Sequence, residues 1–336
     1  MRAWIAIVAA LSSSMWGACG PASTGPGPEE APVMFEDEAA RSAAPSASES
    51  VGRAESLLAQ GEAAEAEAIL REALAADAQD ERAHLDLGLA LEMQERFQEA
   101  EQSYRAALEV NSEFPEALNN LGVLLRDSER TDEALSSLRA AIRVRPGFAS
   151  AHLNLALALE DAGELEDAAQ SYERVIELAP QAATARIQLG LLQLASGERD
   201  QALITLRRAA QPSAGNRALL SALGSGLRRA GDAEMAMRTL QEAVDADESP
   251  APAAVVAELA LAQFAAEHRP EAESTLTGLI QRSPDFATAH YLLANMLAAR
   301  RAFADAGRSY QAYLRAEPDG PHAEQARGRL QFVRQQ

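Results

Sequence analysis

Histidines and carboxylates are the side chains in this sequence that could bind a metal or transfer a proton. The five histidines are His84, His152, His268, His290 and His322. Three of them share one position of a repeat described below and lie at least two repeats apart, so they cannot share one metal. Paired acids such as Glu160 and Asp161 are common among 50 acidic residues and are typical of a solvated surface. No Gly-rich phosphate loop, GxSxG or HExxH motif occurs. The sequence therefore predicts no catalytic residue, no metal site and no cofactor.

The only cysteine, Cys19, follows an apolar run near the N-terminus. Arg2 precedes the run Ala3–Leu11, and small residues stand directly before the cysteine. This order is typical of a secretory signal, and the run is shorter than the ~20 residues that span a bilayer. The triplet Gly17-Ala18-Cys19 resembles a bacterial lipobox, although Trp16 replaces the usual aliphatic residue. A single cysteine excludes an intramolecular disulfide.

The lipobox resemblance implies a location for the protein. Residues 1–19 would be the signal peptide, and a lipidated Cys19 would anchor the mature chain in a membrane. Gly20, in place of an aspartate, favours the outer membrane and a chain that faces the periplasm. Residues 20–46 are rich in Pro, Gly, Ser, Ala and acids, which predicts a disordered tether. The alternatives are an ordinary secretory peptide with an incidental cysteine and a cytoplasmic protein whose apparent signal is spurious.

Charge excludes some classes of partner. The formal net charge is −20, which argues against nucleic acid and against electrostatic docking on anionic lipid. All basic residues other than histidine are arginines. Residues 47–114 have 16 acids and 5 arginines, whereas residues 287–336 have 4 acids and 7 arginines. The chain is therefore acidic at the start of its repeats and basic at its end.

From residue 47 the sequence repeats with a period of 34 residues, with two extra residues before 253. The eight units are 47–80, 81–114, 115–148, 149–182, 183–216, 217–250, 253–286 and 287–320. Position eight is small wherever the pattern is clear, position twenty is always Ala, and position twenty-four is Leu or Tyr. Small residues let two helices approach closely, and large ones fill the space between them. Gly at position fifteen and Pro at position thirty-two predict the turns.

This pattern resembles the tetratricopeptide repeat family over residues 47–320, with signatures ALNNLGVLL at 117–125 and AHLNLALAL at 151–159. The resemblance implies an all-α fold, an α-solenoid of eight helix-turn-helix tetratricopeptide repeats forming a right-handed superhelix. Residues 321–336 have apolar residues at helical spacing and predict a C-terminal capping helix.

In the family, the first helix of each repeat lines a concave groove with its positions two, five, nine, twelve and thirteen. Carried over by position, and with the position-six asparagines added, the predicted partner-binding residues are Leu85, Leu89, Asn119, Asn120, Val123, Leu153, Asn154, Leu157, Ile187, Leu191, Leu261, Tyr291 and Asn295. The predicted rim is Arg82, Glu92, Arg126, Glu160, Arg228 and Arg229. The apolar centre favours a bound peptide, or else tight packing of the helices. Asn120 and Asn154 would bond either a peptide backbone or their own neighbours.

The layout resembles that of lipid-anchored tetratricopeptide proteins, which include pilotins, outer-membrane assembly components and adaptors for cell-wall enzymes. The expected function is a protein–protein interaction scaffold of the bacterial cell envelope that binds a protein or peptide partner. A cytoplasmic scaffold without an anchor is the alternative. An enzyme is not expected, because residues 1–46 and 321–336 are too few for a catalytic domain.

Overall fold

The computed structural model describes residues 47–246 and 249–336, which form α-helices and short connections with no strand among them. The first helices of the eight units are α2 (Ala47–Gln60), α4 (Glu81–Met93), α6 (Pro115–Asp127), α8 (Ala149–Ala162), α10 (Ala183–Ala195), α12 (Arg217–Ala230), α14 (Ala253–Ala265) and α16 (Ala287–Ala299). The second helices are α3 (Ala63–Ala76), α5 (Phe97–Val110), α7 (Thr131–Val144), α9 (Leu165–Leu178), α11 (Arg199–Arg207), α13 (Ala233–Asp245), α15 (Arg269–Arg282) and α17 (Phe303–Ala316). The last helix is α18 (Ala323–Val333). The predicted signal peptide, the tether and Cys19 lie outside the described residues.

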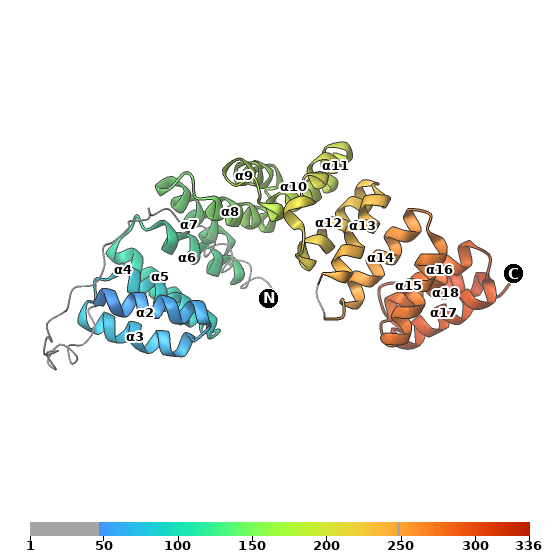
Figure 1. Cartoon of the computed structure of the whole chain (residues 1–336), viewed down its shortest axis with the longest axis horizontal. Helices are drawn as coiled ribbons and strands as arrows, with labels where there is room; N and C mark the ends of the chain where they lie inside the picture. Colours follow the sequence, from blue (N-terminus) through green and yellow to red (C-terminus); the bar gives the residue numbers. More distant parts are fainter. Residues whose placement is uncertain (1–46, 247–248) are drawn as a thin grey trace, which may run out of the picture. The chain divides into compact units, whose positions relative to one another are not determined.

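Neighbouring helices in the sequence are also neighbours in space, as Figure 1 shows for the paired helices of each unit. Each second helix packs on its own first helix and on the first helix of the following unit. Several first helices also contact the next first helix, as α10 contacts α12. The major helix contacts in the described part of the chain reach no further than the next helix but one. This is the packing of a solenoid, so the predicted all-α repeat fold is confirmed.

The repeated small and large residues form the centre of each helix pair. All eight position-twenty alanines and all eight position-twenty-four residues are fully buried. A Cβ placed on Gly88 would lie 2.4 Å from Cε1 of Tyr104, and one on Gly122 would lie 2.6 Å from Cγ of Leu138. Two helices can pack this closely only because the first one has no side chain at the crossing point.

The turn between the two helices of a unit has the same backbone conformation in all eight units. The four predicted glycines at position fifteen, Gly61, Gly163, Gly197 and Gly231, have positive φ angles between 77° and 98°. The other four units hold a side chain in this left-handed region: Glu95, Glu129, Glu267 and Arg301, with φ between 60° and 66°. An L-residue in this conformation is strained by about 1–2 kcal/mol. The packing of the helix pair therefore fixes the turn, whichever residue occupies it.

Unit 5 departs from the pattern. Its second helix, α11, has 9 residues, compared with 14 in α9 of the preceding unit. A short 3-10 helix, η2 (Gln211–Ser213), and Gly215 with φ 73° follow it. Pro212 has no N–H to continue the helical hydrogen bonds, which explains why the regular helix ends early. The boundary between units 5 and 6 therefore departs from the regular helix pair.

None of the described helices is both long enough and apolar enough to cross a membrane.

Candidate partner-binding surface

The first helices of successive units share a surface, called the inner face below. Ion pairs between neighbouring first helices define it: Arg82 of α4 pairs with Glu55 of α2 at 2.8 Å, and Arg228 of α12 pairs with Glu258 of α14 at 3.1 Å. Because these bonds join one first helix to the next, the side chains between them also lie along this face. The predicted groove residues all belong to these first helices.

The structure divides the predicted groove residues into two sets. Those with a half-buried side chain are Leu89, Asn120, Val123, Leu153, Leu191, Leu261 and Asn295. Those that are buried are Leu85, Asn119, Asn154, Leu157, Ile187 and Tyr291. Position nine thus remains partly open except at the buried Leu157, while most position-five side chains belong to the core. The core signal and the groove signal overlap in sequence, since both require apolar residues at helical spacing.

The predicted asparagines bond to one another. Nδ2 of Asn154 donates to Oδ1 of Asn119 at 2.9 Å, and Nδ2 of Asn119 donates to Oδ1 of Asn120 at 3.1 Å. Together they connect α8 with α6 through an amide chain that is largely buried. The sequence left open whether these amides bond a peptide backbone or their own neighbours. In the structure they bond their own neighbours. Asn120 is the half-buried member and keeps part of its amide at the surface.

Glu92 and Glu160 occupy position twelve of units 2 and 4, and each carboxylate accepts a hydrogen bond from a tyrosine. Tyr104 of α5 donates to Glu92, and Tyr172 of α9 donates to Glu160. Burial, together with the nearby charge of Asp127, raises the pKa of Glu92 to about 7. Burial also raises the pKa of Glu160. The inner face therefore carries two acidic groups that ionise less readily than ordinary glutamates.

Other predicted rim residues are paired within the chain. Arg126 is largely buried and bonds Asp127 at 2.8 Å and, on the next first helix, Asp161 at 3.7 Å. Asp86 lies beneath Arg82, with 3.4 Å between Nε and Oδ2, and burial raises its pKa to about 6. The sequence analysis did not single out Asp86. It occupies position six, as Asn120 does in the following unit, and this shared position could have identified it as an inner-face residue.

At the C-terminal end, side chains of α16 in unit 8 bond to α18 and to the segment just before it. The Tyr291 ring stacks on His322 with centroids 4.4 Å apart, and its hydroxyl donates to Gln325 at 2.7 Å. Oδ1 of Asn295 accepts hydrogen bonds from Tyr310 at 2.6 Å and from Arg329 at 2.5 Å. The predicted groove residues of unit 8 therefore bind the chain's own capping segment.

Three histidines have one structural role. Nε2 of His84, His152 and His290 lies 3.0–3.1 Å from the carbonyl oxygen six residues earlier, in the preceding turn. The sequence analysis did not predict this bond. Within the described residues, no cluster of three potential metal ligands occurs.

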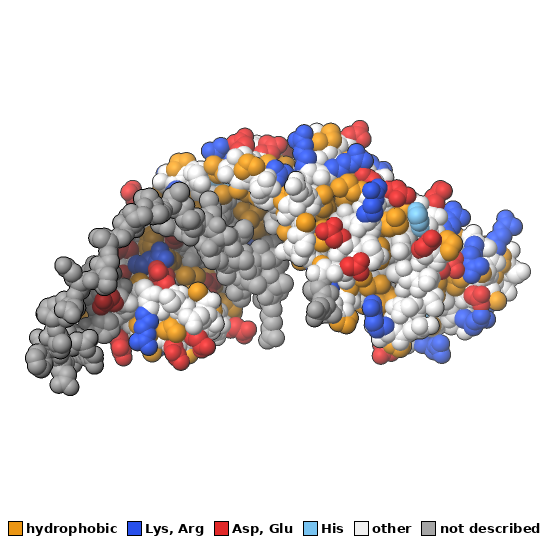
Figure 2. Space-filling model, viewed as in Figure 1, with side chains coloured by type: hydrophobic (Ala, Val, Ile, Leu, Met, Phe, Trp, Pro, Cys, Tyr) orange, Lys and Arg blue, Asp and Glu red, His pale blue; other side chains and the backbone are white. Residues whose placement is uncertain are grey.

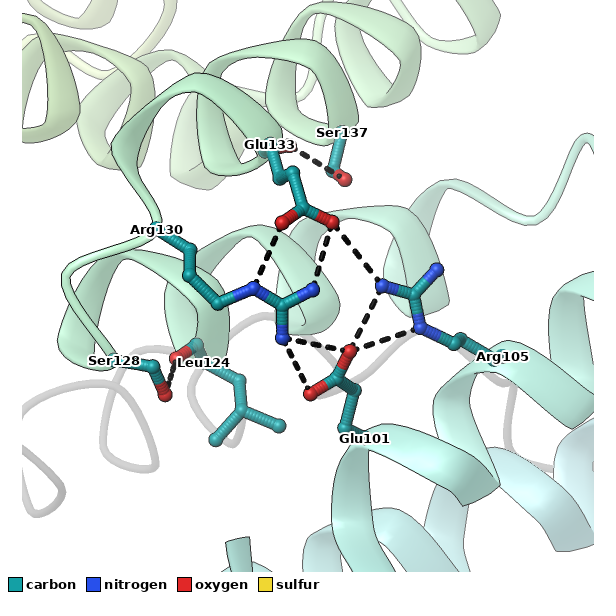
Figure 3. A network of polar contacts seen from close by, with 7 residues as sticks. All are labelled: Glu101, Arg105, Leu124, Ser128, Arg130, Glu133 and Ser137. Carbon is teal, nitrogen blue, oxygen red and sulfur yellow. Dashed lines mark hydrogen bonds and ion pairs between the residues drawn. The ribbon is translucent and has the colours of Figure 1, made fainter. Parts of the chain in front are cut away.

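A network of arginines and glutamates joins the second helices of neighbouring units. Nη1 of Arg130 binds both carboxylate oxygens of Glu101 at 2.8 and 2.9 Å, while its Nε and Nη2 bind Glu133 at 2.8 and 2.7 Å. Arg105 completes the square by bonding Glu101 and Glu133, as Figure 3 shows. The same arrangement one unit earlier consists of Glu67, Arg71, Arg96 and Glu99. Sequence reasoning missed both networks, although arginine at position sixteen and glutamate at position twenty-one recur with the period.

Comparison with known proteins agrees with this architecture. A family model for the tetratricopeptide repeat matches residues 51–117, 94–143, 119–183, 159–218 and 257–321, more than half of the chain. No curated protein matches the sequence. Among solved structures, the chain resembles PilF of Pseudomonas aeruginosa with a TM-score of 0.54 and 23% identity, over 59% of this chain and 90% of that one. It also resembles a chain of the Cut9–Hcn1 hetero-tetramer of the APC/C with a TM-score of 0.54 and 17% identity, over 84% of this chain and 55% of that one. At these identities the structural likenesses show the fold alone.

Stacked helix pairs with a shared inner face define a helical-repeat scaffold, a non-catalytic fold class that supports protein–protein interaction. The chain belongs to the tetratricopeptide repeat family.

Proposed function

We propose that this protein is an interaction scaffold of the bacterial cell envelope that binds a peptide or protein partner along its inner face, as an assembly factor or adaptor. The observation that supports it is the row of half-buried apolar side chains at position nine. Leu89, Val123, Leu191 and Leu261 lie on four different first helices and keep part of their apolar surface in water. A partner segment laid across successive units would cover this surface.

Substitution of Val123 and Leu191 by Asp tests the groove. Both residues are half-buried, so the variants are expected to fold, which circular dichroism would check. Proteins crosslinked to the chain in intact cells and then identified should disappear in both variants. Ile204→Asp is the matched control, because Ile204 is 47% exposed on a second helix, away from the inner face. Partners retained by folded Val123→Asp and Leu191→Asp variants would exclude the inner face as the binding surface.

The envelope location rests on the N-terminal sequence. Arg2, the apolar run Ala3–Leu11 and the small residues before Cys19 support export followed by lipidation of this cysteine, and Gly20 supports the outer membrane. A Cys19→Ser variant should move from the membrane fraction to the soluble periplasm. If the parent chain fractionates with the cytoplasm, the unanchored scaffold is correct and the envelope role is wrong.

A further inference from the structure

Two acids on the second helices, the buried Glu67 and the half-buried Glu101, are matched with arginines. Glu67 lies 2.7 Å from Arg96 and 2.6 Å from Arg71, and Glu101 lies 2.8 Å from Arg130. Burial alone would raise the pKa of both glutamates, but hydrogen bonds and the charges of the arginines lower it below its ordinary value. The arginines therefore neutralise these two carboxylates on the second helices.

Glu92 and Glu160 on the inner face lack this compensation. Each carboxylate accepts a tyrosine hydroxyl, and within the described residues no arginine or histidine forms an ion pair with either one. The charges that influence them are acidic: Asp127 acts on Glu92, and Asp161 acts on Glu160. A carboxylate has room for about four hydrogen bonds, so each keeps acceptor capacity after the tyrosine has bonded.

Arg126 does not provide the missing cationic partner for Glu92 or Glu160. Arg126 stands at position twelve of unit 3, between the two glutamates along the array, but it is 13% exposed and bonded to Asp127 and Asp161. Those two aspartates remain 54% and 59% exposed. The inner face of units 2–4 therefore presents a surplus of negative charge with oriented, half-buried acceptors at two equivalent places. In Figure 2, acidic side chains are also visible on the surface of unit 1, around α2 and α3.

We propose that the partner segment on the inner face is basic, and that Glu92 and Glu160 each receive one of its cationic side chains. This inference rests on the proposed function, because it specifies the occupant of the same surface. The two sites are two units apart, which is roughly 20 Å at about 10 Å per helix layer. An extended chain advances about 3.3 Å per residue. The two cationic residues are therefore about six residues apart in the partner.

A labelled synthetic peptide tests the charge and the spacing. The probe is a peptide of about ten alanines and serines, with two arginines about six residues apart. Its two controls carry citrulline in place of arginine, or arginines about two residues apart. Fluorescence anisotropy at pH 8 and low salt should show binding about tenfold tighter for the first peptide than for the closely spaced one, which loses one charge-assisted contact of about 1.4 kcal/mol. The citrulline peptide loses both contacts and should bind about a hundredfold more weakly than the first peptide.

The protein variants are Glu92→Gln and Glu160→Gln, in which glutamine still accepts the tyrosine hydrogen bond and the fold is kept. Each should lose about tenfold in affinity for the arginine peptide and none for the citrulline peptide. Glu177→Gln is the matched control, because Glu177 is 65% exposed on the second helix α9. Equal loss in all three variants would mean attraction by net charge alone and would overturn the proposal. Displacement by spermidine as effective as by the peptide would also overturn it.

The two proposals can fail separately. If crosslinked partners vanish in Leu191→Asp but persist in Glu92→Gln and Glu160→Gln, and the arginine peptide shows no preference, the inner face binds a partner that is not basic. If Leu191→Asp retains every partner while the peptide still needs both glutamates, the cationic sites stand and the apolar groove does not.

Discussion

The hydroxyl of Tyr104 donates a hydrogen bond to the carboxylate of Glu92, across the two helices of unit 2. Burial raises the pKa of this glutamate to about 7, compared with an ordinary value near 4.3 in the unfolded chain. The folded protein therefore holds a proton that the unfolded chain has released between these two values. Stability from this group is fully present only below the unfolded pKa of about 4.3, and it is lost as the pH rises from there to about 7.

Glu92→Gln should remove this pH dependence. Relative to the parent, the variant is expected to gain on the order of 1–3 kcal/mol at pH 8 and about a third of that gain at pH 5. Urea unfolding at both pH values measures the difference, with Glu177→Gln as an exposed control. Equal stability changes at pH 5 and pH 8 would show that the Glu92 carboxyl titrates normally.

The close helix crossing in unit 2 predicts that an added methyl group is harmful. In Gly88→Ala the new Cβ would overlap the Tyr104 ring, and the forced shift should cost about 1–2 kcal/mol. Gly278→Ala is the matched control, because nothing lies within 4 Å of its Cβ position in α15 and the change should stabilise the helix by about 0.5–1 kcal/mol. Units 1, 4, 7 and 8 hold Ala at this position, so the effect is specific to the helix pairs that have Gly there. A stabilised Gly88→Ala would contradict the packing account.

The left-handed turns predict opposite effects for opposite substitutions. Glu129 has φ 60°, so Glu129→Gly should relieve strain and stabilise the protein by about 0.5–1 kcal/mol. Gly163 has φ 77° with open space around it, so Gly163→Ala should destabilise by about 1 kcal/mol through the backbone alone. Thermal and urea unfolding of the two variants check these signs. A loss of stability in Glu129→Gly would mean that its side chain contributes more than its backbone strain.

The network in Figure 3 predicts a salt-dependent coupling between units 2 and 3. A double-mutant cycle with Glu101→Gln and Arg130→Gln should give a favourable coupling energy that falls as salt rises to about 1 M. The same cycle on Arg174 and Glu177, an exposed pair within α9, should give a smaller coupling. If the two coupling energies are equal, the contact between units 2 and 3 gains no stability from an arginine that binds two carboxylates at once.

The capping helix predicts a local effect. Leu330 is 9% exposed and packs with Tyr310 and Tyr313, so Leu330→Ala should cost about 2 kcal/mol. Because contacts are between neighbours, hydrogen exchange should rise in α16, α17 and α18 and stay unchanged in α4 to α9. Phe332→Ala is the control, since Phe332 is 55% exposed. A uniform rise in exchange along the chain would show that the array unfolds as one block.

The sequence predicted the residues whose role depends only on their own unit. The buried alanines, the large residues opposite them and the four glycine turns follow from the period, and the structure has them where expected. Glu95 in the same turn was not foreseen, because glutamate carries no signal for a positive φ. Whether a position-five residue is open or closed depends on the neighbouring unit, so Leu85 and Tyr291 were placed in the groove although they are buried.

The sequence also did not predict which charged residues of different units form ion pairs. The pair Arg130 and Glu101 is separated by 29 residues, and many other charges stand at comparable distances in a chain with 50 acids. Only the packing of α7 beside α5 selects this pair. The irregular end of α11 likewise follows from Pro212 in its own context, which the repeat pattern did not reveal.

Among the described residues, the main helix contacts stop at the next helix but one, so a whole repeat can be removed while its neighbours keep their own packing. Deletion of residues 115–148 would bring α8 against α5, and Asn154 would take the place of Asn120, the same amide at the same position. Glu92 and Glu160 would then stand one repeat apart instead of two. The shortened protein should select arginines about three residues apart, roughly half the original interval. The number of repeats between the two glutamates would thus set the spacing of the arginines that the protein selects. Duplication or loss of one repeat in the gene would change that spacing in a single step.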